Sequence, residues 1–392
     1  MGFVGRGAFE DMSENSKRVK ALNWAALVIM MVFYAGTWTF AGFYHVTEIY
    51  NTLIIFVALV ILFFNNVDPI KKLKEGDKSF YLLGLTLAVA AVNLFIIRSN
   101  KGCFLILADF LLVFYLSKEI RLTELQLKTL EIFFLVMFAS WFVYDRTFSF
   151  NANTGATATV FTMLGAYVML NRICRIREIY GFIAVIAVIR TANLVLWHLA
   201  RGAFIALFVF LVLFYAIPRK LWLNSVFYRG LTFFSIFGSL LFVLAYVLLS
   251  ATGINPRMPF FYKNVFSGRE QIWMEVWEIF IEQPLTGIGS GRALKSFFEY
   301  NIHNAMYDIL AVHGVIVFAL AVILIIRRLF EAEKVIEAAS GANAEKILCA
   351  AAVFAIFIES FIDMDLMWAD YSPVLLFLLY EIFHVRQTDG YE

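Results

Sequence analysis

The sequence predicts an all-helical integral membrane protein with about twelve transmembrane helices and one large outward-facing loop that contains short helices. Of its 392 residues, 62% are hydrophobic and only 16% are charged, whereas soluble proteins carry about 25% charged residues. A transmembrane helix needs about 20 apolar residues. Twelve apolar runs of this kind follow one another along the chain: 22–43, 47–64, 79–97, 102–117, 127–144, 154–170, 179–198, 202–217, 230–249, 304–326, 346–362 and 371–384.

Basic residues orient these runs, because Lys and Arg accumulate in the cytoplasmic loops of membrane proteins. Residues 1–20 form a polar segment, and an even number of spans places both termini on one side. If that side is cytoplasmic, it holds 22 of the 32 basic residues. No small-residue cleavage site follows the first run, so we expect a retained anchor rather than a signal peptide.

The order of the runs divides the chain into three parts, which we expect to form one structural unit. Residues 1–249 hold nine spans, residues 250–303 form the outward-facing loop, and residues 304–392 hold three spans. The loop is the only long stretch whose composition suits water. We therefore expect any chemistry to take place there.

The loop contains one predicted amphipathic helix, at 268–283. Trp273, Trp277 and Phe280 recur at helical spacing, and glutamates occupy a more polar side. Tryptophan favours the headgroup region of a bilayer. We therefore favour an anchoring role at the membrane surface over direct stacking on a substrate, although the pattern is compatible with both.

Several kinds of chemistry are excluded by what the sequence lacks. It has no P-loop, and an outward-facing site has no ATP supply, so the substrate should carry its own activation energy. GIGSG at 287–291 indicates a tight turn after Pro284 rather than a dinucleotide-binding turn. Cys103, Cys174 and Cys349 show no metal-ligand spacing. We expect no cofactor, no metal and, because the net charge of +2 is scattered, no nucleic-acid partner.

Three outward-facing side chains could act together. Arg201 precedes the eighth run, Arg269 lies in the loop, and His303 stands where the loop meets the tenth run. Guanidinium groups suit a diphosphate, which they bind through bidentate, charge-assisted hydrogen bonds. Histidine can accept a proton near neutral pH. His198 and His313 are rivals, but the first is an interfacial residue in this topology and the second lies almost three turns into the tenth run.

Two further residues are candidates beside these three. Arg190 lies near the middle of the seventh run, where a charge is costly and is by default functional or paired. Glu359 in the eleventh run is a possible partner, so a binding role and a structural role for Arg190 both remain open. Asn304 directly follows His303, and we include it with the arginines as a diphosphate-binding candidate.

The motifs around these residues resemble those of the bacterial O-antigen ligase family. The resemblance rests on RG-x4-L from Arg201, on GR…W…P-x-x-G-x-G at 268–289 and on HN-x9-G at 303–314. The DRTFSFNANTGATATVFTM stretch at 145–163 and the last two spans around Trp368 are also similar. Together the motifs cover most of the chain, and their order and topological placement carry the likeness.

The resemblance implies a reaction and a location. Such a ligase would transfer a polysaccharide from undecaprenyl diphosphate to a sugar hydroxyl of lipid A-core oligosaccharide, without ATP or metal. His303 would be the general base, Arg201 and Arg269 would bind the diphosphate, and the anomeric carbon would be inverted. The active site would lie on the periplasmic face of the bacterial inner membrane, with both termini cytoplasmic and membrane lipids around the spans.

Other functions remain open. An O-antigen or capsular polysaccharide polymerase would use the same lipid-linked donor with a different acceptor, and protein O-oligosaccharyltransferases are a third related group. A transporter or flippase commonly has twelve spans, but it often shows two related halves, and the sequence shows no such repeat. A membrane scaffold would leave the outward Arg and His residues without a role.

Overall fold

The computed structural model describes residues 4–39, 50–97, 102–144, 152–176, 181–258, 261–290, 294–295, 302–339, 344–363 and 365–384. Within these ranges the secondary structure is helical, apart from one isolated antiparallel bridge between Arg257 and Asn264. The 145–151 part of the stretch that resembles the ligase family lies outside the described residues.

Helices follow one another along the chain, and each predicted apolar run overlaps one of them. Their bounds are α1 (Val4–Thr39), α3 (Asn51–Asn66), α4 (Pro69–Glu75), α5 (Lys78–Ile97), α6 (Gly102–Glu119), α7 (Glu124–Tyr144), α8 (Ala152–Ile176), α9 (Gly181–Trp197), α10 (Arg201–Leu211) with the π-helix η3 (Val212–Ala216), α11 (Arg219–Trp222), α12 (Ser225–Ser250), α13 (Arg269–Phe280), α14 (Ala305–Ala338), α15 (Ala344–Glu359), the 3₁₀ turns η4 (Asp365–Met367) and η5 (Ala369–Tyr371), and α16 (Ser372–Phe383).

The helices confirm an all-helical membrane protein. In the described part of the chain, four helices are long and apolar enough to cross a membrane: α1 from Lys17 onward, α5, α12 and α14. The pair α3 and α4 would add a fifth span, although the two helices are bent by 63° relative to each other. The number of twelve spans, the orientation and the outward position of the loop remain predictions.

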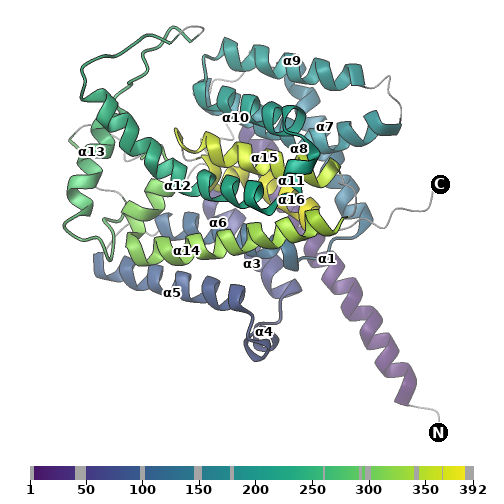
Figure 1. Cartoon of the computed structure of the whole chain (residues 1–392). Helices are drawn as coiled ribbons and strands as arrows, with labels where there is room; N and C mark the ends of the chain where they lie inside the picture. The colour runs from purple at the N-terminus through teal and green to yellow at the C-terminus, as the bar shows by residue number, and fades with distance from the viewer. Residues whose placement is uncertain are drawn as a thin grey trace.

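The core of the bundle is built around α15 and α16. Nearly every residue of these two helices is buried, and α15 packs against α8, α10, α12 and α16 (Figure 1). The outer helices instead expose large apolar side chains, among them Phe95 on α5, Phe182 on α9 and Leu241 on α12. A soluble protein rarely leaves so much apolar surface in water, so these faces fit contact with lipid.

The two ends of the bundle differ. α13 packs against α12 and α14 at one end of the molecule, whereas α4 packs against the start of α5 at the other end (Figure 1). The predicted outward loop therefore lies at one end of α5, and the lysine-rich residues 71–78, between the second and third predicted runs, lie at the other. The helix predicted at 268–283 is confirmed as α13, with Trp273 and Phe280 buried and Trp277 half exposed.

Candidate active site

His303 is held in an unusual backbone conformation at the entrance to α14. Its φ of 52° lies in the left-handed region, which residues with a side chain seldom adopt. The next residue, Asn304, is fully buried and caps α14 by accepting a hydrogen bond from the Tyr307 amide at 2.9 Å. The Asn304 side chain also accepts from Ser239 Oγ at 2.9 Å and donates to Phe361 O at 2.8 Å. Asn304 thus fixes the backbone that carries His303, and its side-chain amide forms its hydrogen bonds with other residues of the protein.

α13 is hydrogen-bonded to the start of α14, next to His303. Trp273 Nε1 donates to the carbonyl oxygen of Ile302 at 2.5 Å, and Tyr307 Oη donates to the Trp273 carbonyl at 3.0 Å. Trp273 is 1% exposed, so these bonds are shielded from water. The predicted amphipathic helix therefore positions the first turn of α14 and, with it, His303.

Asp363 brings His303 and Arg269 together. Its Oδ1 lies 3.2 Å from His303 Nδ1, and its Oδ2 lies 3.5 Å from Arg269 Nη2. A carboxylate at Nδ1 favours the tautomer whose proton is on Nδ1, which leaves the lone pair on Nε2. The three side chains are 16–22% exposed, so substrate can approach them. Sequence reasoning missed Asp363, whose only signal is its place in the predicted outward connection between the last two spans.

Asp363 belongs to a group of three carboxylates with Glu359 and Asp365. Oxygens from all three lie within 4.8 Å of one another, an arrangement that could hold a metal ion. Burial, together with the carboxylate of Asp363, raises the pKa of Asp365 well above its usual range. If Asp365 keeps its proton, the repulsion between the three carboxylates is relieved without a cation. Asp363 is then left as the charged partner of His303.

Arg201 is attached to the loop that precedes α13. Its guanidinium donates to the carbonyls of Asn264 at 2.9 Å and Val265 at 3.0 Å. The adjacent Gly202 packs directly on Glu359, because a Cβ at Gly202 would lie 2.7 Å from Glu359 Oε1. The Arg-Gly pair of the motif is thus adjacent to the cluster of three carboxylates to which Asp363 belongs.

Lys263 adds a third cation that sequence reasoning did not select. Its Nζ donates to the carbonyl of Leu199 at 3.0 Å. Burial lowers the pKa of Lys263, and the nearby guanidinium groups of Arg201 and Arg269 lower it further. Lys263, Arg201 and Arg269 therefore share one electrostatic field, which is suitable for a strongly anionic ligand. Arg269 connects this field to His303 through Asp363.

Arg190 lies elsewhere. It is on α9, where its Nη1 donates to Asn193 Oδ1 at 3.2 Å. α9 packs on α8 and α10 at the edge of the bundle (Figure 1). Glu359, the partner considered for Arg190 from the sequence, lies with Asp363 and Asp365.

The remaining glycines of the motifs form a backbone contact. Ile288 and Gly289 donate to the carbonyls of Ala311 and Val312 at 2.8 and 3.0 Å, and α14 is kinked at Gly314 with φ 84° and ψ 166°. A Cβ at Gly314 would overlap the Leu285 carbonyl. A turn follows Pro284, as predicted, and the segment through Gly289 docks into the kink, whereas Gly291 of the predicted turn lies outside the described residues. Both glycine motifs therefore serve one close contact between loop and helix.

A comparison with protein families finds a match, and it covers the segment that carries most of the candidate residues. Residues 184–322 match the family model described as O-Antigen ligase. The matched segment contains Arg190, Arg201, Arg269, His303 and Asn304, whereas Asp363 lies beyond it. No curated protein matches the chain. The O-antigen ligase family is therefore what this segment, rather than the whole chain, is similar to.

Proposed function

We propose that the protein is an O-antigen ligase, a glycosyltransferase of the bacterial inner membrane. In this proposal it transfers a polysaccharide from undecaprenyl diphosphate to a sugar hydroxyl of lipid A-core oligosaccharide on the periplasmic face. The observation that carries the proposal is the Asp363 carboxylate, which contacts a potential base, His303, and a potential phosphate ligand, Arg269, at once. A base and an anion site at one point are what transfer from a diphosphate-linked donor requires.

The proposed reaction is a single displacement. His303 Nε2 removes the proton of the acceptor hydroxyl while the oxygen of that hydroxyl attacks the anomeric carbon of the donor. The bond between that carbon and the diphosphate oxygen breaks, and undecaprenyl diphosphate leaves with the bonding electrons. Asp363 stabilises the imidazolium that forms at His303. Because attack and departure are in line, the configuration at the anomeric carbon is inverted.

Arg201, Arg269 and Lys263 are proposed to bind the diphosphate and stabilise it as it leaves. Their shared field supports this role, since the pKa of Lys263 is lowered in part by both guanidinium groups. An anion among three cations removes that mutual repulsion on binding. Asn304 and Arg190, which the sequence also suggested as diphosphate ligands, are not among the ligands proposed here. Asn304 holds the His303 backbone, and Arg190 lies on α9.

An apolar groove is proposed to hold the polyprenyl tail. A cavity of about 480 Å³ lies between α12, α13 and α14, and its lining is almost entirely apolar: Leu240, Leu241, Val243, Leu244, Val247, Trp273, Met274, Trp277, Tyr307 and Leu310. The groove adjoins the site through Trp273, whose indole contacts the carbonyl of Ile302 next to His303. A tail placed there would stay against apolar surface while its diphosphate reaches the three cations.

The proposal is tested by complementation in a bacterial strain that lacks its own O-antigen ligase. We expect the chain to restore a ladder of polymer linked to lipid A-core, and we expect His303→Ala to abolish it at equal membrane expression. Longer chains that stay on undecaprenyl diphosphate would instead identify a polymerase. A ladder that persists at full intensity in His303→Ala would contradict the proposed base.

A further inference from the structure

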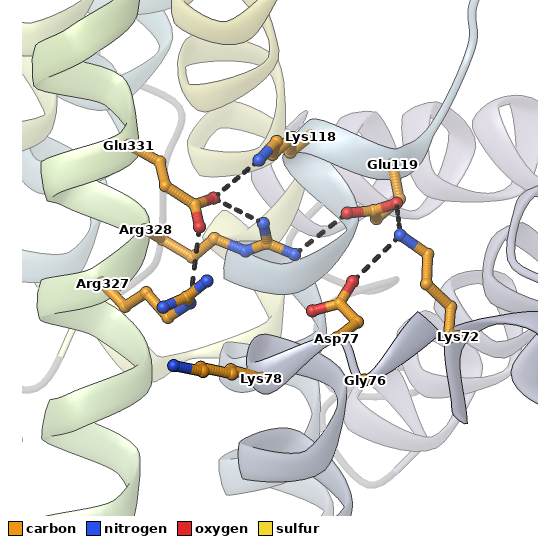
Figure 2. A pocket seen from close by; sticks show the side chains of 9 residues that line it. All are labelled: Lys72, Gly76, Asp77, Lys78, Lys118, Glu119, Arg327, Arg328 and Glu331. Carbon is orange, nitrogen blue, oxygen red and sulfur yellow. Dashed lines mark hydrogen bonds and ion pairs between the residues drawn. The ribbon is translucent and has the colours of Figure 1, made fainter. Parts of the chain in front are cut away.

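A second polar site lies at the opposite end of the molecule, where α4, α5, α6 and α14 meet. A cavity of about 440 Å³ is lined there by Lys72, Gly76, Asp77, Lys78, Lys118, Glu119, Arg327, Arg328 and Glu331 (Figure 2). Arg327 and Arg328 are more than 20 residues beyond His303 along the chain, near the other end of α14. The cavity is therefore separate from the proposed active site.

The carboxylates of this cavity already form ion pairs with basic side chains of the lining. Lys72 Nζ lies 2.6 Å from Glu119 and 3.0 Å from Asp77. Glu331 accepts from Lys118 at 2.9 Å and from Arg328 at 2.8 Å. The lining holds five cationic and three anionic side chains, so two positive charges remain uncompensated in the cavity.

The excess charge is concentrated on Lys78 and Arg327. In the described part of the chain, Lys78 Nζ has no carboxylate within ion-pair distance, and Figure 2 draws no contact to it. Arg327 bonds only through Nε, to Ser79 Oγ at 2.8 Å and Glu331 Oε1 at 3.4 Å, so its two Nη groups have no partner among the described residues. Because Ser79 adjoins Lys78, the two cationic side chains stand at one edge of the cavity.

The surroundings of the cavity are those of a membrane interface. α4 is bent by 63° from α3 and exposes Ile70 and Leu73. The first turns of α5 expose Tyr81 and Leu85 in the same region. A short helix with exposed apolar residues beside a cluster of lysines is typical of a segment at the level of lipid headgroups.

We propose that this cavity binds the phosphate of an anionic phospholipid, with Lys78 and Arg327 as its principal ligands and its acyl chains along α5. A phosphodiester supplies a negative charge to a cavity whose lining has two more cations than anions, and the two Nη groups of Arg327 can bind it in bidentate fashion. The headgroup would connect α5 with α14, the long helix whose other end begins next to His303. The site requires no particular reaction at His303.

The test is a titration of the detergent-solubilised full chain, followed by native mass spectrometry. The probes are short-chain phosphatidylglycerol, short-chain phosphatidylcholine and inorganic phosphate. We expect phosphatidylglycerol to bind best, and Lys78→Ala and Arg327→Gln each to weaken it about fivefold, as expected for one basic residue near an anionic headgroup. Lys74→Ala is the matched control, since Lys74 is exposed on α4 outside the cavity lining.

Each other outcome would overturn the assignment. Equal binding of phosphatidylcholine would show that net charge is not recognised. Equal loss in Lys74→Ala would show diffuse attraction by surface lysines. Saturable binding of inorganic phosphate with none of phosphatidylglycerol would assign the cavity to a soluble anion and exclude the lipid. Lys78 makes no ion pair in the described residues, so Lys78→Ala keeps the test valid if Arg327→Gln fails to fold.

Discussion

Replacement of Asp363 by Asn tests the contact that connects the proposed base to the anion site. The change keeps the shape of the side chain and removes its charge, so His303 loses its anionic partner at 3.2 Å and Arg269 loses its partner at 3.5 Å. At an effective dielectric of about 20, unit charges 3.2 Å apart attract by roughly 5 kcal/mol. Because His303 and Asp363 are about one-fifth exposed, we assign the contact the value of a charge-assisted hydrogen bond, about 1.5–3 kcal/mol.

That free energy corresponds to a transfer rate lowered about 10- to 150-fold. The assay is the initial rate with solubilised full chain, lipid-linked polysaccharide donor and lipid A-core acceptor, at saturating donor. Glu282→Gln is the control, because this loop carboxylate is exposed to solvent and we assign it no role in the site. An Asp363→Asn rate within twofold of wild type, with an unchanged melting temperature, would refute the role given to Asp363.

Three further predictions follow from the same geometry. Gly314→Ala should lower the melting temperature, since its φ of 84° costs about 1–3 kcal/mol for a residue with a Cβ. Gly84→Ala is the control and should leave the melting temperature unchanged, because a Cβ there would enter open space, and equal losses in the two variants would contradict the docking contact. Asp365→Asn should stabilise the protein more at pH 8 than at pH 5, because the folded state keeps a proton that the unfolded chain releases above about pH 4; a pH-independent difference in melting temperature would count against this. Lys263→Gln should raise the KM for the donor about five- to tenfold with a smaller change in kcat, and an unaltered KM would remove Lys263 from the site.

The sequence was sufficient for the helices because their signal is local. An apolar run of membrane-spanning length has few alternatives to a helix, and each predicted run overlaps one. The short helix α13 was found for the same reason, from the spacing of Trp273, Trp277 and Phe280. The N-terminal helix was less well predicted, since α1 begins at Val4, within the polar segment that precedes the first run.

The candidate site could be predicted only in part, because its decisive contact is not local. Asp363 is 60 residues from His303 and 94 from Arg269, and no periodicity connects positions so far apart. The meaning of Gly314 was also hidden, since only the structure shows that the 284–289 turn docks into its kink. Arg190 was considered because of its charge within an apolar run, a signal that cannot tell which side of the helix faces a partner.

In the proposed reaction, His303 activates an acceptor hydroxyl beside a bound diphosphate. The most direct measurement is the release of undecaprenyl diphosphate and the formation of lipid A-core-linked polymer in the purified system, with wild-type protein, His303→Ala and Arg269→Ala. We predict equimolar formation of both products by wild type and at least a 100-fold loss in His303→Ala, the size expected when general-base help is removed. Product formation by His303→Ala at the wild-type rate, from a protein with an unchanged melting temperature, would show that His303 is not the base.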